Sequence, residues 1–191
     1  MDKYIEIPNQ KFNRIFTVGD LEKLFKTGIL SKNESVELVE GEILLRRETV
    51  LDELQKAKKI AKNLSQAFGD KALVKIQHSI NLYEIQSLKP SIAVIKPFSA
   101  DKTNQTNAED TFFVIELTDL RFNYTENSRC RYYGQFNYPE VWFVNLDLSL
   151  VEVCTQPNYG YSRCRTYLRS DTIKSENSPD LQIEANKLLS T

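Results

Sequence analysis

The heptapeptide TFFVIEL, residues 111–117, is a nearly continuous apolar run that carries one charged side chain, Glu116. A run of this kind, without polar alternation, is typical of a β-strand that is covered on both faces. A carboxylate that enters a core is costly unless it is paired, hydrogen-bonded or bound to a metal. The stretch therefore predicts a central strand, and it marks Glu116 as either a functional acid or a member of a structural ion pair.

A second buried strand is predicted in LKPSIAVIKPF, residues 88–98. Its interior, residues 92–95, is apolar and β-branched, and a proline stands on each side. Ser91 follows Pro90 directly, at the point where the strand would enter the core. This serine either ends a turn or occupies a position where a more demanding chemical group is expected.

Helices and further strands are predicted around these two. Residues 50–68 place apolar side chains at intervals of three and four, the pattern of an amphipathic helix. Thr17 and Asp20 have the spacing of a capping box, which predicts the start of another helix, and residues 127–136 also have helical spacing. A hairpin or a bent strand is predicted at 36–47, and strands at 72–84, 140–147, 149–156 and 160–168. This order predicts one domain over residues 1–191, of mixed α/β or α+β class, with one central sheet.

The charge balance excludes some functions. Lys and Arg number 25 and Asp and Glu number 26, so the formal net charge is −1. No global field favours nucleic acid or an anionic membrane, and binding of either would need a local patch. MDKYIEIPNQ lacks the apolar segment of a signal peptide, and no run reaches transmembrane length. We therefore expect a soluble, cytoplasmic protein without a membrane partner.

The cysteines argue against a structural metal site. Cys130, Cys154 and Cys164 form no CxxC pair, and the only histidine is His78, so a zinc site of the usual Cys/His type is not expected. A disulfide between Cys154 and Cys164 can be drawn if the two face each other on a hairpin. Reduced thiols in a cytosolic protein are the favoured interpretation.

Two further groups of residues could carry chemistry. Glu37, Glu40 and Glu42 alternate along a predicted strand, so we expect them on a solvated face, although one could turn inward to a divalent cation. In the second group, arginines alternate with tyrosines, a mix that could contact phosphates and stack bases. We expect Tyr133 and the nearby Phe136 to pack inward and the arginines to stay solvated or to pair with acids. The exception is Arg129, which could meet the carboxylate of Glu116 if its helix docks beside that strand. The group comprises Arg121, Tyr124, Arg129, Arg131, Tyr132 and Tyr133.

Four segments together resemble the Uma2 family, also called DUF820, a group abundant in cyanobacteria. They are FTVGDLEKLFKTGILSKNESVELVEGEI, KPSIAVI, FFVIELTD and NYTENSRCRYYGQFNYPEVWFVNLD. The resemblance covers about residues 15–185. It implies a restriction-endonuclease-like α/β fold, in which a central twisted mixed sheet is flanked by helices. It also implies a site of the PD-(D/E)xK type, where carboxylates hold Mg²⁺ and a lysine assists the attack of water on a phosphate.

The resemblance assigns the site residue by residue. The hairpin acid of the family matches Glu40, with Glu42 close by, and the strand glutamate matches Glu116; these three would be the metal ligands if a metal binds. The aspartate after the proline falls on Ser91, the lysine falls on Arg129, and an acid before the lysine falls on Thr125. A neutral hydroxyl is a poor ligand for Mg²⁺, and an arginine is a poor base because it does not deprotonate.

These departures imply a degenerate site with little or no metal-dependent cleavage. The leading hypothesis is a nuclease-fold protein that acts in binding or regulation, with DNA as a possible partner. The resemblance also implies a homodimer that pairs through the apolar C-terminal strands. One alternative is an active Mg²⁺-dependent DNA endonuclease, in which Asp119 or Glu42 replaces the missing acid. The other is a structural interaction domain that does not bind nucleic acid.

Overall fold

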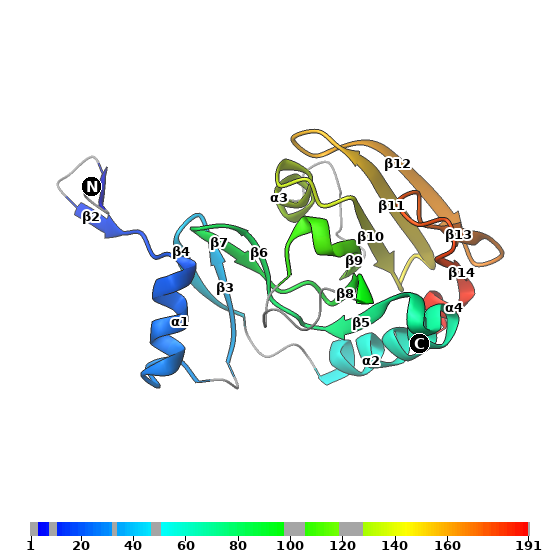
Figure 1. Ribbon diagram of the computed structural model, residues 1–191, viewed down its shortest axis with the longest axis horizontal. Helices are drawn as coiled ribbons and strands as arrows, with labels where there is room; N and C mark the ends of the chain where they lie inside the picture. The colour runs from blue at the N-terminus through cyan, green and yellow to red at the C-terminus, as the bar shows by residue number, and fades with distance from the viewer. Residues whose placement is uncertain are drawn as a thin grey trace.

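A six-stranded mixed sheet forms the larger part of the molecule (Figure 1). The computed structural model describes residues 4–7, 11–31, 34–46, 51–97, 106–118 and 128–190. The strand order is β12-β11-β10-β9-β8-β5, and only β9 and β10 run parallel, whereas the other neighbours are antiparallel. The strands are β5 (Leu73–Ile76), β8 (Ile92–Ile95), β9 (Thr111–Thr118), β10 (Glu140–Asn145), β11 (Leu150–Pro157) and β12 (Tyr161–Leu168). The α/β class with a central mixed sheet is confirmed.

Strand β9 is covered on both faces, as the TFFVIEL pattern predicts. Phe113 and Ile115 pack into one core, and Val114, between them, packs into a second core on the other face. Helix α2 (Leu51–Phe68) lies on the first face and helix α3 (Ser128–Gln135) on the second. Because successive side chains of a strand point to opposite faces, an apolar strand between two helical layers needs no polar alternation.

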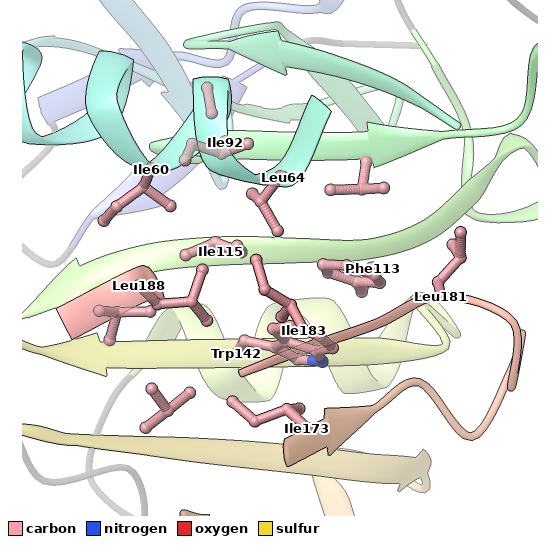
Figure 2. Packing of buried hydrophobic residues seen from close by; sticks show 14 of the residues in the cluster. Ile60, Leu64, Ile92, Phe113, Ile115, Trp142, Ile173, Leu181, Ile183 and Leu188 are labelled. Atoms are coloured by element: carbon pink, nitrogen blue, oxygen red, sulfur yellow. The ribbon is translucent and has the colours of Figure 1, made fainter. Parts of the chain in front are cut away.

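The first core is the larger of the two (Figure 2). Ile60 and Leu64 of α2 are fully buried against the sheet, and Phe113 stacks on Trp142 with ring centroids 3.9 Å apart. Three short C-terminal elements close the rest of this face: β13 (Thr172–Lys174), β14 (Gln182–Glu184) and α4 (Asn186–Leu189). The helix predicted at residues 50–68 is confirmed over 51–68.

A second, four-stranded sheet with the order β4-β3-β7-β6 stands beside the first. Its strands are β3 (Ser35–Val39), β4 (Glu42–Arg46), β6 (Ile80–Tyr83) and β7 (Gln86–Leu88). Helix α1 (Val18–Lys26) packs on it and begins with the predicted capping box, in which the Asp20 N–H donates to Thr17 Oγ1 at 3.1 Å. The remaining elements are β1 (Tyr4–Ile7), β2 (Lys11–Arg14) and the 3₁₀ turns η1 (Gly69–Lys71) and η3 (Ala108–Asp110).

The prediction of one long strand over residues 72–84 is wrong. Gln77 has a left-handed φ of 48°, and its N–H donates to the carbonyl of Ser91 at 3.2 Å. The chain therefore leaves the large sheet after β5 and enters the small sheet at β6. The periodicity of the side chains is the same in both strands, so it gives no sign of the break.

The prediction of reduced cysteines is also wrong for two of the three. Cys154 and Cys164 lie opposite each other on β11 and β12 and form a disulfide, whereas Cys130 is a free, buried thiol. The composition of the chain does not encode the register of this hairpin, and the register is what brings the two residues together.

The buried carboxylate of Glu140 gives a first stability prediction. It accepts hydrogen bonds from Trp142 Nε1 at 3.0 Å, Ser175 Oγ at 2.7 Å and the Asn177 N–H at 2.7 Å. Because Glu140→Gln exchanges one acceptor oxygen for an NH₂ group, at least one buried donor loses its partner. We expect the free energy of unfolding to fall by about 1–3 kcal/mol.

Urea denaturation measures this change, and Glu176→Gln is the matched control. Glu176 is exposed and pairs with Arg163 at 3.0 Å on the surface, so its loss should cost at most about 0.5 kcal/mol. Equal urea midpoints for the two variants would contradict a structural role for the Glu140 hydrogen bonds.

Candidate functional site

Arg129, in the first turn of α3, lies between two buried carboxylates. Its Nε and Nη2 each lie 2.7 Å from Glu116 Oε1, and its Nη1 donates to the two carboxylate oxygens of Glu37 at 2.8 and 2.9 Å. Nη2 also donates to the carbonyl of Lys89 at 3.1 Å. The planar fork of the guanidinium matches this arrangement, because it presents several donors in fixed directions. Arg129 thus joins β3 of the small sheet to β9 of the large sheet.

Tyr133 completes the contacts on the α3 side. It lies one helical turn after Arg129, is fully buried, and donates its hydroxyl hydrogen to Glu116 Oε1. The same hydroxyl oxygen accepts from Arg129 Nη2 at 3.3 Å. Burial raises the pKa of Tyr133 well above its usual value, and the Glu116 carboxylate raises it further against the opposing effect of Arg129. The phenol therefore remains a hydrogen-bond donor.

The charge of Arg129 is permanent in this setting. Burial lowers its pKa, but Glu116, Tyr133 and Glu37 raise it more, so the pKa stays well above its usual value. Arg129 contacts both carboxylates, Glu116 Oε1 also accepts from the Tyr133 hydroxyl, and Glu37 Oε1 accepts from the Lys89 N–H at 2.7 Å. Buried charges in proteins are normally compensated in this way.

Ser91 lies beside this group but contributes no charge. It immediately precedes β8, whose Ile92 is paired with Ile115, the residue before Glu116. Its side chain is 6 % exposed, and its hydroxyl oxygen accepts the Leu117 N–H at 3.1 Å. Ser91 therefore sits at the entrance of the strand next to Glu116, and its oxygen is engaged with the backbone.

The hairpin acid that reaches Arg129 is Glu37. It is 4 % exposed, so the expectation of a solvated face is wrong for this residue. The carboxylate of Glu40 is exposed at the turn, where it accepts from Tyr132 Oη at 2.9 Å and lies 4.0 Å from Arg131, and Glu42 is exposed on β4. The structure thus brings Glu37, and neither Glu40 nor Glu42, to the Arg129–Glu116 pair.

Sequence reasoning named Glu37 but did not single it out from Glu40 and Glu42. Alternating acids are expected to be solvated only if one face of the strand is open to water, whereas both faces of β3 are covered here, with Val36 and Leu38 buried on one and Glu37 on the other. The one available signal is VELV at residues 36–39, where the apolar residues occur at both parities and so indicate cover on both faces.

The described residues do not fit Mg²⁺. Among them, no three or more His, Cys, Asp or Glu side chains are grouped so that they could hold a metal ion. Mg²⁺ requires near-octahedral oxygen ligands. The carboxylates of Glu37 and Glu116 converge, but both bind the guanidinium of Arg129, which supplies no oxygen ligand. Asp119, Arg121, Tyr124 and Thr125 lie outside the described residues.

A transmembrane helix is not found in the described part of the chain, because none of its helices is both long and apolar enough to cross a bilayer.

Comparisons with known proteins agree with the fold. The model of the Uma2 family, described as "Putative restriction endonuclease", matches residues 21–186. A solved structure from Anabaena variabilis, described as "a putative nuclease belonging to DUF820", superposes with a TM-score of 0.70 at 13 % sequence identity, covering 92 % of this chain and 98 % of that one. At this identity the likeness concerns the fold alone. No curated protein matches the chain. Since the family model spans most of the sequence, the chain belongs to the Uma2 family.

Proposed function

We propose that this chain is a nuclease-fold protein that binds a partner and has little or no metal-dependent cleavage. The observation that carries the proposal is the position of Arg129, whose guanidinium contacts Glu37 and Glu116 at 2.7–2.9 Å. A metal ion between these carboxylates would have to displace a cation that already makes charge-assisted hydrogen bonds to both.

The chemistry of the residues supports the same conclusion. In a PD-(D/E)xK site the metal supplies the activation of water and the stabilisation of charge at the phosphate. Here Arg129 neutralises the acids instead, and it does not accept a proton because it remains ionised. Ser91 supplies a neutral oxygen that already accepts the Leu117 N–H. Neither Arg129 nor Ser91 can serve as a general base at neutral pH.

The competing function is a Mg²⁺-dependent DNA endonuclease. One observation favours it: Glu37 and Glu116 come from different sheets yet converge on one point, as the carboxylates of a metal site do. In that case Arg129 would leave the pair, and Asp119 would supply a third carboxylate.

Plasmid nicking in the presence of Mn²⁺ separates the two functions. We expect no nicking by the wild-type protein, and we expect Mn²⁺ binding and nicking by the double variant Ser91→Asp, Arg129→Lys, which restores an acid and a lysine. Adding Glu37→Gln to this double variant should abolish both, whereas adding Glu40→Gln should not. Nicking by the wild-type protein that is lost in Glu116→Gln would overturn the proposal.

DNA and a second copy of the chain are the proposed partners. A salt-sensitive complex with duplex DNA in metal-free buffer would support the first, because neutralised phosphates release counterions. Its absence would favour an interaction domain without nucleic acid. For the second, β12 is an edge strand of the large sheet with an exposed Leu168, and such an edge can pair with another strand.

A further inference from the structure

The hairpin of β11 and β12 is crosslinked next to α3. Cys154 and Cys164 face each other in the antiparallel register and are joined by a disulfide that closes a loop with a sequence separation of 10. Both belong to the second core, the one that α3 covers. Cys154 is fully buried, whereas Cys164 is half-buried and so is the more accessible sulfur.

Helix α3 rests directly on this hairpin. Gly134 of α3 lies against Gly160 in the β11–β12 turn so closely that a Cβ on Gly134 would stand 1.8 Å from the Gly160 carbonyl oxygen. Beside it, the Tyr161 hydroxyl donates to the carbonyl of Tyr138 at 2.7 Å. At this contact the backbone of the hairpin limits where α3 can lie, because no side chain stands between Gly134 and Gly160 to absorb a movement.

The same helix delivers Arg129 and Tyr133 to the acid pair. Arg129 makes bonds to Glu37 and Glu116 that are each shorter than 3 Å. Charge-assisted hydrogen bonds of this kind depend steeply on geometry. A shift of α3 relative to the two sheets would therefore weaken these hydrogen bonds first.

We propose that the Cys154–Cys164 disulfide is a redox-responsive clamp on α3: its reduction by a thiol or dithiol loosens the hairpin, frees α3 and weakens the hold of Arg129 on Glu37 and Glu116. The crosslink restricts the motion of β12, which lies at the edge of the large sheet and pairs with β11 among the described strands. Without the crosslink, the hairpin keeps its backbone hydrogen bonds, but its turn end, where Gly160 meets α3, can twist and open.

The reduction balances with two thiol equivalents. The thiolate of the reductant attacks Cys164 Sγ, the disulfide bond breaks, and Cys154 leaves as a thiolate that takes up a proton. A second thiol then attacks the mixed disulfide, so Cys164 leaves as a thiolate that takes up a proton and the reductant becomes a disulfide. Cys130 stays outside this exchange, because burial and the Glu152 carboxylate raise its pKa to about 11 and keep it protonated.

Hydrogen–deuterium exchange of the full chain tests the clamp. Exchange is measured with and without tris(2-carboxyethyl)phosphine, for the wild-type protein and for the variant Cys154→Ser, Cys164→Ser; Cys130→Ser is the matched control. We expect reduction to accelerate exchange within α3 by about tenfold or more, while β8 and β9 keep their protection. The double-serine variant should exchange at the fast rate with or without reductant, whereas the Cys130→Ser protein, which keeps the disulfide, should still show the acceleration on reduction.

Three outcomes would overturn the proposal. One is a count of three titratable thiols in the unreduced, denatured protein, which would mean that the disulfide does not form. Another is unchanged exchange in α3 after reduction. The third is an equal acceleration of exchange in α3, β8 and β9, which would mean that the disulfide stabilises the whole domain and not α3 in particular. Any use of the loosened site rests on the proposed function, but the clamp is measured without DNA or metal, so the nicking assay and the exchange experiment can fail separately.

Discussion

Replacing Arg129 with methionine is expected to lower the free energy of unfolding by about 3–5 kcal/mol, the usual cost of removing one partner from a buried ion pair. Methionine keeps much of the length of the side chain but removes the guanidinium that Glu37 and Glu116, which are 4 % and 5 % exposed, both contact. Carboxylates that are buried without compensation are costly, and the cost here falls on two of them at once.

Arg131→Met is the matched control for this measurement. Arg131 lies two residues away on the same helix, is 62 % exposed and stands 4.0 Å from the exposed carboxylate of Glu40. Its removal should cost less than about 1 kcal/mol. Urea denaturation of the two variants gives the comparison.

The triple variant Glu37→Gln, Glu116→Gln, Arg129→Met then tests the cause of the loss. If uncompensated charge causes the loss, the triple variant should recover a large part of the free energy of unfolding that Arg129→Met loses. Both carboxylates are then replaced by neutral amides. A triple variant as unstable as Arg129→Met would show that packing, and not charge, causes the loss.

Gly134→Ala is expected to destabilise the protein by about 3 kcal/mol or more, at the upper end of the cost of overpacking. The added methyl group would lie 1.8 Å from the carbonyl oxygen of Gly160 and 2.3 Å from its carbonyl carbon. Both atoms belong to the backbone, so no side chain can rotate to make room, and α3 must move away from the β11–β12 hairpin. Because α3 carries Arg129, the displacement should also loosen the ion pairs of the site.

Gly19→Ala provides the control for this substitution. Gly19 lies within helix α1, and the nearest atom to an added Cβ is Thr17 Oγ1 at 3.8 Å, an ordinary contact. Alanine in a helix is favoured over glycine by about 0.5–1 kcal/mol, so the two glycine-to-alanine changes should shift the thermal midpoint in opposite directions. A Gly134→Ala protein as stable as the wild type would contradict the close contact between α3 and the hairpin.

Much of the fold could be predicted because it depends on local patterns. The nearly continuous apolar run at residues 111–117 predicted a strand covered on both faces, and the spacing over 50–68 predicted the helix of the first core. The break at Gln77 could not be predicted, because a single residue with a positive φ of 48° separates strands of the same periodicity. The disulfide was not favoured from the sequence for a similar reason, because composition does not show which residues of a hairpin face each other.

The candidate site was predictable only in part. The proximity of Arg129 and Glu116 was proposed from the sequence, since a helix beside a strand can bring a cation to a buried acid, and the structure shows the contact at 2.7 Å. The third charged residue, Glu37, was not singled out. Whether an acid on β3 points toward α3 depends on how the two sheets are placed, and that placement is a property of the whole fold.

The ion pair between Glu37 and Arg129 joins residues that are 92 positions apart in the chain. Closing so long a loop has a large entropic cost, which is offset only when many non-local contacts form together. Both sheets and the crossover between β9 and β10 must be in place before the guanidinium can meet the second carboxylate. The charged cluster thus contributes little to the early steps of folding; it stabilises the finished arrangement, by penalising any packing that keeps the two acids away from Arg129.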